Sequence, residues 1–225
     1  MGSVVLEKER RIGLFGGTFD PVHEGHLAVA RYAATALDLD QVVFIPAADP
    51  PHKRKTTASF SHRAAMLDIA LSGQGQEDGF EISLTEAQRP APSYTVDTLL
   101  ELQQIFKDQR LFFIIGADSL LEIHLWYRYT QLFSLTDFIV VSRPGISFSA
   151  VCVAIDSLPG DFIRQGAALS WQRRDGAAIF YLSESDVDVS SSSIRQELQR
   201  GGRPQALMAG VQSYIDKNHL YAQKP

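Results

Sequence analysis

A glycine pair and two histidines stand close together near the start of this chain, in the segment Gly-Gly-Thr-Phe-Asp-Pro-Val-His-Glu-Gly-His at residues 16–26. Gly16 and Gly17 follow a short apolar run, and glycine lets the backbone come close to a ligand where a buried strand ends. His23 and His26 are three residues apart, so they share one face of the helix predicted to begin there. The N–H groups and dipole of a helix start attract phosphate. The spacing therefore predicts a phosphate-binding turn.

Zinc binding is the alternative for the two histidines. A zinc site would need further Cys or His ligands at metal-like spacing, and the sequence has none near His23 and His26. We therefore favour phosphate over zinc and expect no metal ligands from the protein.

A second group of anion-binding residues follows far along the chain, in Val-Ser-Ser-Ser-Ser-Ile-Arg at 189–195. Ser191, Ser192 and Ser193 are good residues for a helix start. Arg195 falls near the first turn, where a cation opposes the helix dipole. An anion bound between the dipole and the guanidinium would make that placement favourable. Taken alone, the segment favours a plain serine cap with a solvated arginine; together with the histidine turn, it favours an anion site.

Composition limits the classes of function. The chain has 225 residues, of which 45% are hydrophobic and 21% charged, as in an ordinary globular protein. A net charge of -5 gives no global basic field for nucleic acid. The single cysteine, Cys152, excludes an internal disulfide and fits a reducing compartment. We expect residues 1–10 to form a flexible leader and residues 11–225 a single domain.

Targeting signals are missing from the sequence. No run of 18 or more apolar residues could span a bilayer, and the charged first 11 residues do not read as a signal peptide. These observations predict a cytoplasmic protein with no membrane partner.

Strand and helix signals alternate along the chain. The predicted strands lie at 12–15, 41–45, 80–84, 111–115, 138–141 and 178–182, and the predicted helices at 24–37, 62–71, 95–106, 118–125, 129–133, 191–200 and 204–217. Ser61 is the expected cap of the second helix and Pro204 the first residue of the last. Residues 146–176 show no sustained period and are expected to form an irregular insertion with one helix.

The alternation predicts an α/β fold, a Rossmann-like doubly wound parallel sheet with helices on both faces and a small C-terminal helical portion. Ligands bind such sheets beyond the carboxyl ends of the strands, where the strand order reverses. Gly16 and Gly17 end one predicted strand, and Gly116-Ala117-Asp118 follow another. We expect both tips at the ligand-binding edge.

The two motifs together resemble a known superfamily. Residues 16–26 match the His-x-Gly-His signature of the nucleotidyltransferases, and residues 189–195 resemble their Ile-Ser-Ser-Thr-x-Ile-Arg signature, with Val189 and Ser192 as mild departures. More narrowly, the chain is similar to the bacterial nicotinate-nucleotide adenylyltransferase family along most of its length. The further matching segments are Pro50 to Lys53, Pro92 to Leu99, Gly116 to Asp118, Trp126 with Tyr127, Arg143 to Gly145, and Tyr214 to Tyr221.

The resemblance implies adenylyl transfer from ATP to nicotinate mononucleotide, giving nicotinate adenine dinucleotide (deamido-NAD) and pyrophosphate in NAD biosynthesis. His23, His26 and Arg195 are then the catalytic residues that stabilise phosphate charge. The other residues expected to contact ATP are Gly16, Gly17, Thr18, Phe19, Lys53, Ser191, Ser192, Ser193 and Ile194. Mg²⁺ is expected on the ATP phosphates, held by substrate oxygens and water.

The resemblance also implies an acceptor site for nicotinate mononucleotide. Trp126 can stack on the pyridine ring. Thr95 and the backbone near Tyr127 can donate to the carboxylate, and Asp118 can accept from ribose hydroxyls. The order of substrate binding and the oligomeric state have no signal in the sequence.

Each assignment has a structural alternative. Trp126 could belong to the core, Thr95 and Asp118 could be helix caps, and Lys53 could be a solvated loop charge. Three other functions also stay open: a related transferase such as phosphopantetheine adenylyltransferase, a nucleotide-sensing module without turnover, and a nucleic-acid-binding protein. The length, Thr95 and Trp126 count against the first, the intact histidines against the second, and the acidic net charge against the third.

Overall fold

The computed structural model describes residues 9–50, 56–73, 79–166, 169–183 and 189–222. Most of the predicted leader at 1–10, and the loop that carries Lys53, lie outside the described residues. Within the described part, no helix is long and apolar enough to cross a membrane.

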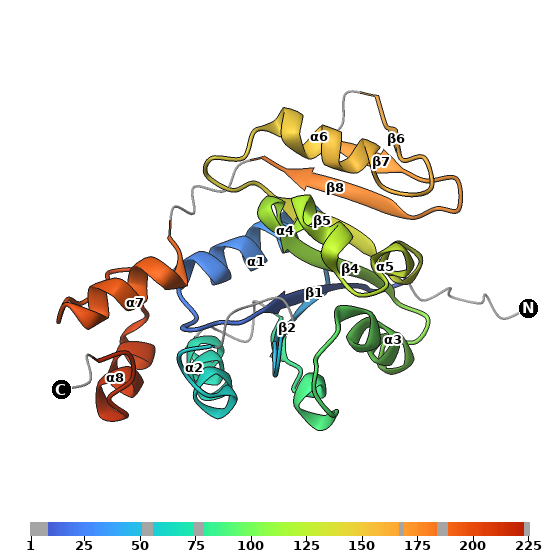
Figure 1. Cartoon of the computed structure of the whole chain (residues 1–225). Coiled ribbons are helices and arrows are strands. Elements are labelled where there is room, and N and C mark those ends of the chain that lie inside the picture. Colours follow the sequence, from blue (N-terminus) through green and yellow to red (C-terminus); the bar gives the residue numbers. More distant parts are fainter. Residues whose placement is uncertain (1–8, 51–55, 74–78, 167–168, 184–188, 223–225) are drawn as a thin grey trace, which may run out of the picture.

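Among the described residues, eight strands form one sheet in the order β3-β2-β1-β4-β5-β8-β7-β6 (Figure 1). The strands are β1 (Arg11–Gly17), β2 (Gln41–Pro46), β3 (Phe80–Ile82), β4 (Arg110–Gly116), β5 (Asp137–Val141), β6 (Ile163–Arg164), β7 (Ser170–Gln172) and β8 (Ala178–Leu182). All pairs from β3 to β8 are parallel. At the far edge, β7 pairs antiparallel with β8, and β6 pairs antiparallel with β7. The predicted fold class is confirmed.

The strand order reverses between β1 and β4. From β1 the chain proceeds outward through β2 to β3, whereas from β4 it proceeds through β5 to β8 on the other side. The parallel pairing of Arg11–Phe15 with Arg110–Ile114 brings the two glycine-ended strand tips, Gly17 and Gly116, to the same edge. Such a switch point leaves a crevice at the carboxyl ends of the strands.

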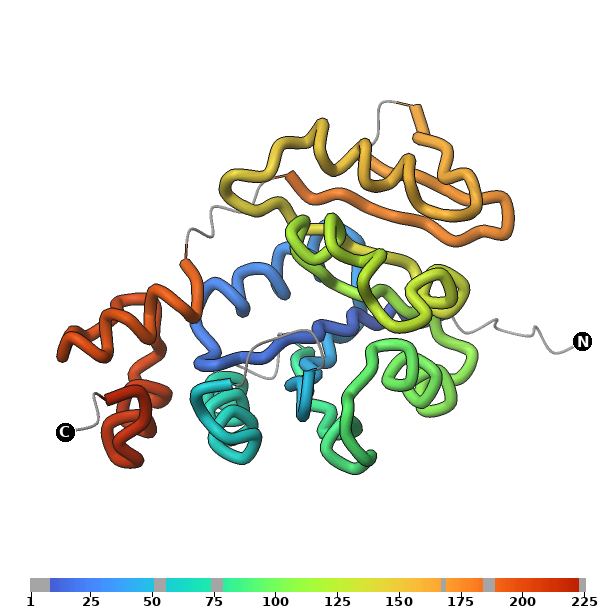
Figure 2. Tube along the Cα trace, viewed as in Figure 1, coloured from blue at the N-terminus to red at the C-terminus, as the bar shows by residue number. Residues whose placement is uncertain are grey.

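Helices cover both faces of the sheet (Figure 2). The helices on one face are α3 (Thr95–Ile105), α4 (Ala117–Leu121), α5 (Tyr129–Leu135) and α6 (Phe148–Asp156), whose buried residues form one core cluster. Those on the other are α1 (Glu24–Ala36), α2 (Phe60–Ser72), α7 (Ser191–Gln199) and α8 (Ala209–Lys217). Short 3₁₀ turns, η2 (Thr85–Gln88) and η3 (Ile123–Leu125), complete the elements.

Strand side chains alternate between the two cores. In β1, Ile12 and Leu14 belong to the core under α3 to α6, whereas Phe15 belongs to the core under α1 and α2. Because both faces are covered, the central strands are nearly continuous runs of apolar residues, as in β4 and β5. This pattern is what the sequence showed for them.

Two predicted helix starts are wrong. Helix α2 begins at Phe60 after Ser59, whose side chain accepts from the His62 N–H, so Ser59 replaces Ser61 as the cap. Helix α8 begins at Ala209, and Pro204 instead precedes a turn that closes with the Leu207 N–H on the Pro204 carbonyl. Proline favours a first helical position but fits turns equally well.

The segment 146–176 is more ordered than predicted. Besides α6, its described residues include β6 and β7, which extend the sheet antiparallel from β8. Val151 and Ile155 of α6 and Trp171 of β7 are buried in the core under α3 to α6. The expected helix is α6, but the expectation of an otherwise irregular insertion is wrong, because strands of two and three residues are too short to show a period-2 pattern.

Candidate active site

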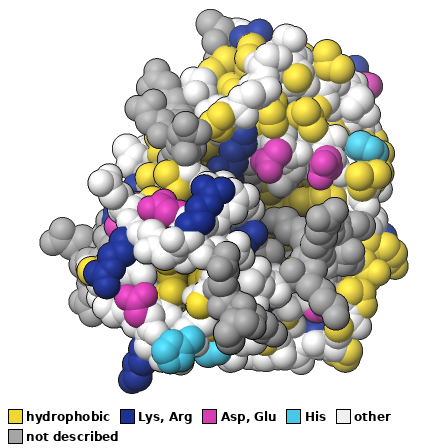
Figure 3. Space-filling view, turned by 60° about the vertical axis from the view of Figure 1, so that its left-hand side comes forward, with side chains coloured by type: hydrophobic (Ala, Val, Ile, Leu, Met, Phe, Trp, Pro, Cys, Tyr) yellow, Lys and Arg dark blue, Asp and Glu magenta, His cyan; other side chains and the backbone are white. Residues whose placement is uncertain are grey.

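A cavity of about 780 Å³ opens at the switch point of the sheet. Its walls come from the ends of β1, β2, β4 and β5 and from the starts of α1, α3, α4 and α7. A cavity of this size is within the range of ligand sites in proteins. In the space-filling view, basic and acidic side chains lie close together around a hollow in this face (Figure 3).

The two histidines stand at the start of α1 and both line the cavity. His23 is the residue before the helix, and its backbone N–H donates to Nδ1 of His26 over 3.2 Å. A ring nitrogen that accepts cannot carry a proton, so neutral His26 bears its proton on Nε2. The two rings lie 3.8 Å apart between centroids, and the Phe19 ring meets that of His26 edge-on at 5.0 Å.

His23 is almost fully buried, with 3% of its surface exposed. Burial, and to a lesser extent the positive charge of Arg143, together lower the pKa of His23 from 6.5 to about 4. His23 is therefore neutral at pH 7 in the free protein. A polyphosphate bound beside it would favour the protonated ring and raise this pKa.

The start of α7 lies against the loop that leads into α1. The Ser191 hydroxyl donates to the Pro21 carbonyl over 2.9 Å, and Arg195 donates to the Asp20 carbonyl over 2.6 Å. Ser190 caps α7 by accepting from the Ser193 N–H. Segments about 170 residues apart in sequence are thus joined, and the serines line the same cavity as the histidines. The segments 16–26 and 189–195 therefore meet at one cavity.

Three residues expected at the ATP site have side chains that lie away from the cavity. Phe19 and Ile194 are 1% and 2% exposed and belong to the core beneath the site. Arg195 also lies outside the cavity lining, because its guanidinium binds the Asp20 carbonyl and the Ser192 hydroxyl, the latter at 3.1 Å. Gly16, Gly17 and Thr18 do line the cavity, whereas Lys53 falls outside the described residues.

The four expected acceptor residues, Thr95, Asp118, Trp126 and Tyr127, all line the cavity. Trp126 is half-buried against the core and meets Phe113 edge-on at 6.4 Å, so it belongs to both the core and the cavity wall. Neither proposed cap exists: Tyr94 precedes α3, and Gly116 precedes α4.

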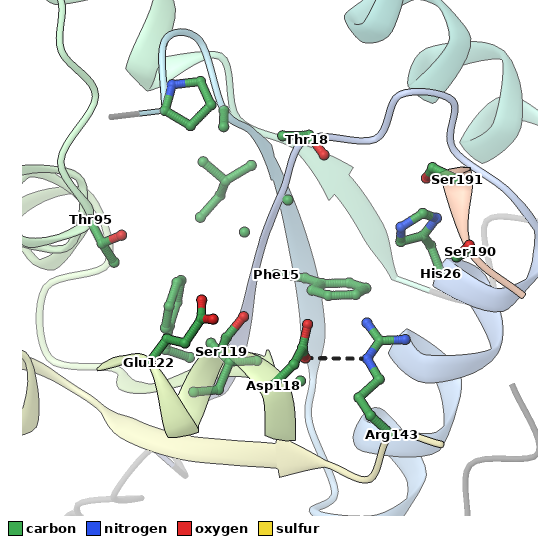
Figure 4. A pocket seen from close by; sticks show the side chains of 18 of the residues that line it. Phe15, Thr18, His26, Thr95, Asp118, Ser119, Glu122, Arg143, Ser190 and Ser191 are labelled. Carbon is green, nitrogen blue, oxygen red and sulfur yellow. Dashed lines mark ion pairs between the residues drawn. The ribbon is translucent and has the colours of Figure 1, made fainter. Parts of the chain in front are cut away.

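The acceptor residues face the phosphate-binding segments across the cavity. In the close view, Thr95 lies on one wall, and His26, Ser190 and Ser191 lie on the opposite side (Figure 4). Asp118, Ser119 and Glu122 form the third side, on α4 and just after it. The residues expected to bind phosphate and those expected to bind the acceptor therefore line opposite sides of one cavity.

Arg143 lines the cavity and had no role assigned from the sequence, although it lies in one of the segments that resemble the family. Its Nε lies 3.6 Å from Oδ1 of Asp118, and the ion pair is drawn in Figure 4. Gly116 makes this approach possible, because a Cβ there would lie 2.2 Å from the same carboxylate oxygen. The position of Arg143, directly after a strand that ends at the ligand-binding edge, was a signal that could have identified it.

A buried arginine on α2 connects the loops after β1 and β2. Arg63 has no exposed surface, and its guanidinium donates to the carbonyls of Thr18 and Ala47, each at 2.7 Å. Since both loops line the cavity, Arg63 fixes the spacing of two of its walls. The Arg63 guanidinium also lies over the Phe60 ring, with Cζ 5.5 Å from the ring centroid, and this cation–π contact stabilises its charge within the core.

Asp20 links the histidine loop to other segments. Its buried carboxylate accepts from the N–H groups of Thr57 and Ala58 and from the Tyr221 hydroxyl, at 2.7, 3.1 and 2.7 Å. These bonds join the residues that follow the Lys53 loop, the C-terminal segment and the start of the site.

Acidic side chains in the cavity do not form a metal cage. Within the described ranges, no group of three or more His, Cys, Asp or Glu residues could hold a metal ion.

Comparison with known families gives a match over most of the chain. Residues 14–197 match the cytidylyltransferase-like family. This range includes both signature segments and every acceptor residue named above.

Curated relatives match almost end to end. A protein of Citrifermentans bemidjiense is 39% identical over 94% of this chain and 98% of its own, and its name reads "Probable nicotinate-nucleotide adenylyltransferase". A protein of Gloeobacter violaceus with the same name is also 39% identical, over 94% of this chain and 96% of its own.

Solved structures share the fold at lower identity. Nicotinic acid mononucleotide adenylyltransferase of Plasmodium falciparum, in complex with NaAD, has a TM-score of 0.73 at 17% identity over 94% of this chain and 97% of its own. The same enzyme in complex with APC gives a TM-score of 0.71. At this identity the likeness shows a common fold.

Proposed function

This chain belongs to the cytidylyltransferase-like family and, within it, to the nicotinate-nucleotide adenylyltransferases, and from that premise we propose how its cavity works. The enzyme joins ATP and nicotinate mononucleotide, giving nicotinate adenine dinucleotide and pyrophosphate in NAD biosynthesis. The observation that carries the proposal is the single cavity lined by both signature segments and, opposite them, by the acceptor residues.

The reaction depends mainly on how the protein positions its two substrates. The 5′-phosphate of the mononucleotide attacks the α-phosphorus of ATP in line, a P–O bond forms, and the bond to the pyrophosphate oxygen breaks. A phosphate monoester is already a nucleophile at neutral pH, so no strong base is needed. Holding two anions in line and neutralising the charge that develops are then the main contributions of the protein.

The histidine pair contacts the α- and β-phosphates. His26 presents the Nε2 proton that its Nδ1 hydrogen bond leaves it, and N–H groups at the start of α1 add donors. His23, neutral in the free enzyme, gains a proton more readily once the phosphates are bound. The attraction of the bound phosphates to these N–H donors and to a protonated His23 strengthens as negative charge builds on the leaving group.

The serines of α7 hold the β- and γ-phosphates. Ser191, Ser192 and Ser193 line the cavity at the start of the helix, where dipole and hydroxyls act together. Arg195 acts in this arrangement by fixing the Asp20 carbonyl and the Ser192 hydroxyl, and it contacts phosphate only if it leaves them. Lys53 is proposed to approach the phosphates from its own loop.

The acceptor occupies the wall formed by α3, α4 and the segment around Trp126. Trp126 offers a ring for stacking on pyridine, while Thr95 and the backbone near Tyr127 donate to the nicotinate carboxylate. These donors would be unmatched against the amide NH₂, which favours the acid. Asp118, held by Arg143, accepts from ribose hydroxyls.

We propose that ATP would be bound with Mg²⁺ on its phosphates. The described residues suit a metal held mainly by substrate oxygens, because they contribute isolated carboxylates and no cage. When bound, the ion neutralises part of the triphosphate charge.

We place the reaction in the cytoplasm, because a single cysteine fits a reducing compartment where ATP is abundant. We also propose that residues 11–225 act as one catalytic domain after a short leader at 1–10.

Pyrophosphate release with ATP and a panel of acceptors tests the function. We expect release with nicotinate mononucleotide, and less with the amide form. Release only with phosphopantetheine would assign the chain to a different transferase, and no release with any acceptor would contradict the proposed reaction.

A further inference from the structure

A buried carboxylate on the cavity wall has no part in the chemistry described so far. Glu86 lies in the 3₁₀ turn η2, which follows β3 in the chain, and is 8% exposed. It contacts both the loop after β2 and the start of α3. Burial raises the pKa of Glu86, and hydrogen bonds from Thr98 and the Ala48 backbone oppose that rise. A polar group this deep needs partners, and its partners show what it does.

Both oxygens of Glu86 are occupied by the protein. Oε1 accepts from the Thr98 hydroxyl at 2.9 Å, and Oε2 accepts from the Ala48 N–H at 3.1 Å. Ser93 adds a side-chain hydrogen bond. Glu86 therefore links the loop after β2 to the first turns of α3. Both of its carboxylate oxygens accept hydrogen bonds within this link.

Arg89 sets the direction of the hydrogen bonds. Its Nη2 donates to the Thr98 oxygen at 2.6 Å, and its Nη1 pairs with Glu101 at 3.0 Å. The Thr98 hydroxyl accepts from Arg89 and has one proton to donate, for which the Glu86 carboxylate at 2.9 Å is a nearer acceptor than the Tyr94 carbonyl at 3.2 Å. Charge at both ends makes the chain stronger than a neutral one.

A second pair of bonds joins the same two segments. The Ser93 N–H donates to the Asp49 carbonyl at 3.0 Å, and the Asp49 N–H donates to the Ser93 hydroxyl at 3.1 Å. Tyr94 and Thr95 follow immediately and line the cavity. The position of these two residues relative to β2 is thus fixed by Ser93 and Glu86 together.

The network is separate from the phosphate-binding side. The histidines and serines stand on α1 and α7, and the close view places Thr95 across the cavity from His26 and Ser191 (Figure 4). None of the hydrogen bonds named above for Glu86, Thr98 or Arg89 reaches α1 or α7.

We propose that Glu86 and Thr98 are positioning residues that set the affinity for the mononucleotide acceptor, by holding the start of α3 against the loop after β2. They act through Tyr94 and Thr95 and leave ATP binding nearly unchanged. This inference rests on the proposed function and adds the residues that determine the acceptor's place.

Thr98→Val is the sharpest test, because it keeps the shape of the side chain and removes the hydroxyl that Glu86 and Arg89 share. Loss of a buried hydrogen bond of this kind predicts a rise of about tenfold in the KM for nicotinate mononucleotide, with the KM for ATP within about twofold of wild type. Thr98→Ser restores the hydroxyl and should return the acceptor KM to within about threefold of wild type.

Gln103→Met supplies the matched control. Gln103 is on the same helix and donates to the Leu135 carbonyl at 2.8 Å, away from the network. Its loss should cost stability without changing either KM. Thermal unfolding of all variants shows whether they are folded, and Glu86→Gln replaces Thr98→Val if the latter does not fold.

The outcomes separate the two proposals. A wild-type enzyme that makes no dinucleotide overturns the proposed function. An active wild type in which Thr98→Val leaves the acceptor KM unchanged, raises both KM values equally, or is not rescued by Thr98→Ser overturns the positioning role.

Discussion

At the scale of single residues, the site depends on the protonation states of two histidines. The hydrogen bond from the His23 N–H to Nδ1 of His26 decides which His26 nitrogen faces a ligand. Burial keeps His23 neutral in the free protein. Both effects follow from the position of the pair at the start of α1.

His26→Ala should remove stabilisation that grows as charge develops. We expect turnover to fall by about a hundredfold to a thousandfold, as for loss of one donor to a developing anion, with the acceptor KM nearly unchanged. Steady-state kinetics would show this split. His124→Ala, at an exposed position outside the cavity lining, is the control, and undiminished turnover in His26→Ala would refute the role.

Trp126→Ala should separate the two uses of this residue. If the ring stacks on the acceptor, the KM for nicotinate mononucleotide rises by about tenfold, as for loss of an aromatic contact, while the KM for ATP stays close to wild type. A large loss of thermal stability with equal changes in both KM values would show that Trp126 serves the core alone.

His23 makes stability depend on pH. Its folded pKa of about 4 lies below the unfolded value of 6.5, so the unfolded chain binds more protons between these values. The contribution of neutral His23 to the free energy of unfolding is complete above pH 6.5 and is lost as the pH falls through about 4. It amounts to about 3 kcal/mol.

Urea unfolding of wild type and His23→Asn between these pH values measures the contribution. The wild-type free energy of unfolding should fall more steeply with acid than that of the variant. Parallel curves would mean that His23 is not held neutral by burial.

At the scale of elements, the site is assembled by loops that buried polar side chains fix in place. Asp20 receives bonds from the segment after the Lys53 loop and from the C-terminal Tyr221, and its carbonyl receives one from α7. Arg63 joins the loops after β1 and β2. The strands supply the edge, and these residues set the distances along it.

Asp20→Ala should therefore affect both stability and activity. It leaves the part-buried Thr57 N–H, the buried Ala58 N–H and the Tyr221 hydroxyl without their acceptor, at a cost of about 3 kcal/mol in the free energy of unfolding. Turnover should fall as well, because Arg195 and Ser191 are anchored to the same loop. Chemical denaturation and kinetics check this.

Asp175→Asn is the control for Asp20→Ala, since its exposed ion pair with Arg173 lies outside the site. It should resemble wild type in both measurements. An Asp20→Ala enzyme that is as stable as wild type would contradict the linking role.

At the scale of the whole molecule, the sequence predicted the sheet and the two signature segments because each has strong local signals. β1, β2, β4, β5 and β8 are runs of apolar and β-branched residues, and the histidine turn and serine helix start are spaced by helix geometry. The fold then determines that they meet, because parallel strands align their carboxyl ends.

Other parts had no such signal. β6 and β7 are too short to show a period, and Glu86 is a single polar residue whose role comes from neighbours distant in sequence. Phe19 and Ile194 lie inside motifs but face the core, because adjacent residues of a turn or helix point in different directions. Such features depend on tertiary contacts that local patterns do not contain.

The central claim is that polyphosphate is held between the histidines of α1 and the serines of α7. A crystal structure with a non-hydrolysable ATP analogue, Mg²⁺ and nicotinate mononucleotide tests it directly. The account predicts phosphate oxygens within about 3 Å of His26 and of the Ser191 to Ser193 hydroxyls or N–H groups, with the pyridine ring beside Trp126. A triphosphate that binds away from either segment would contradict it.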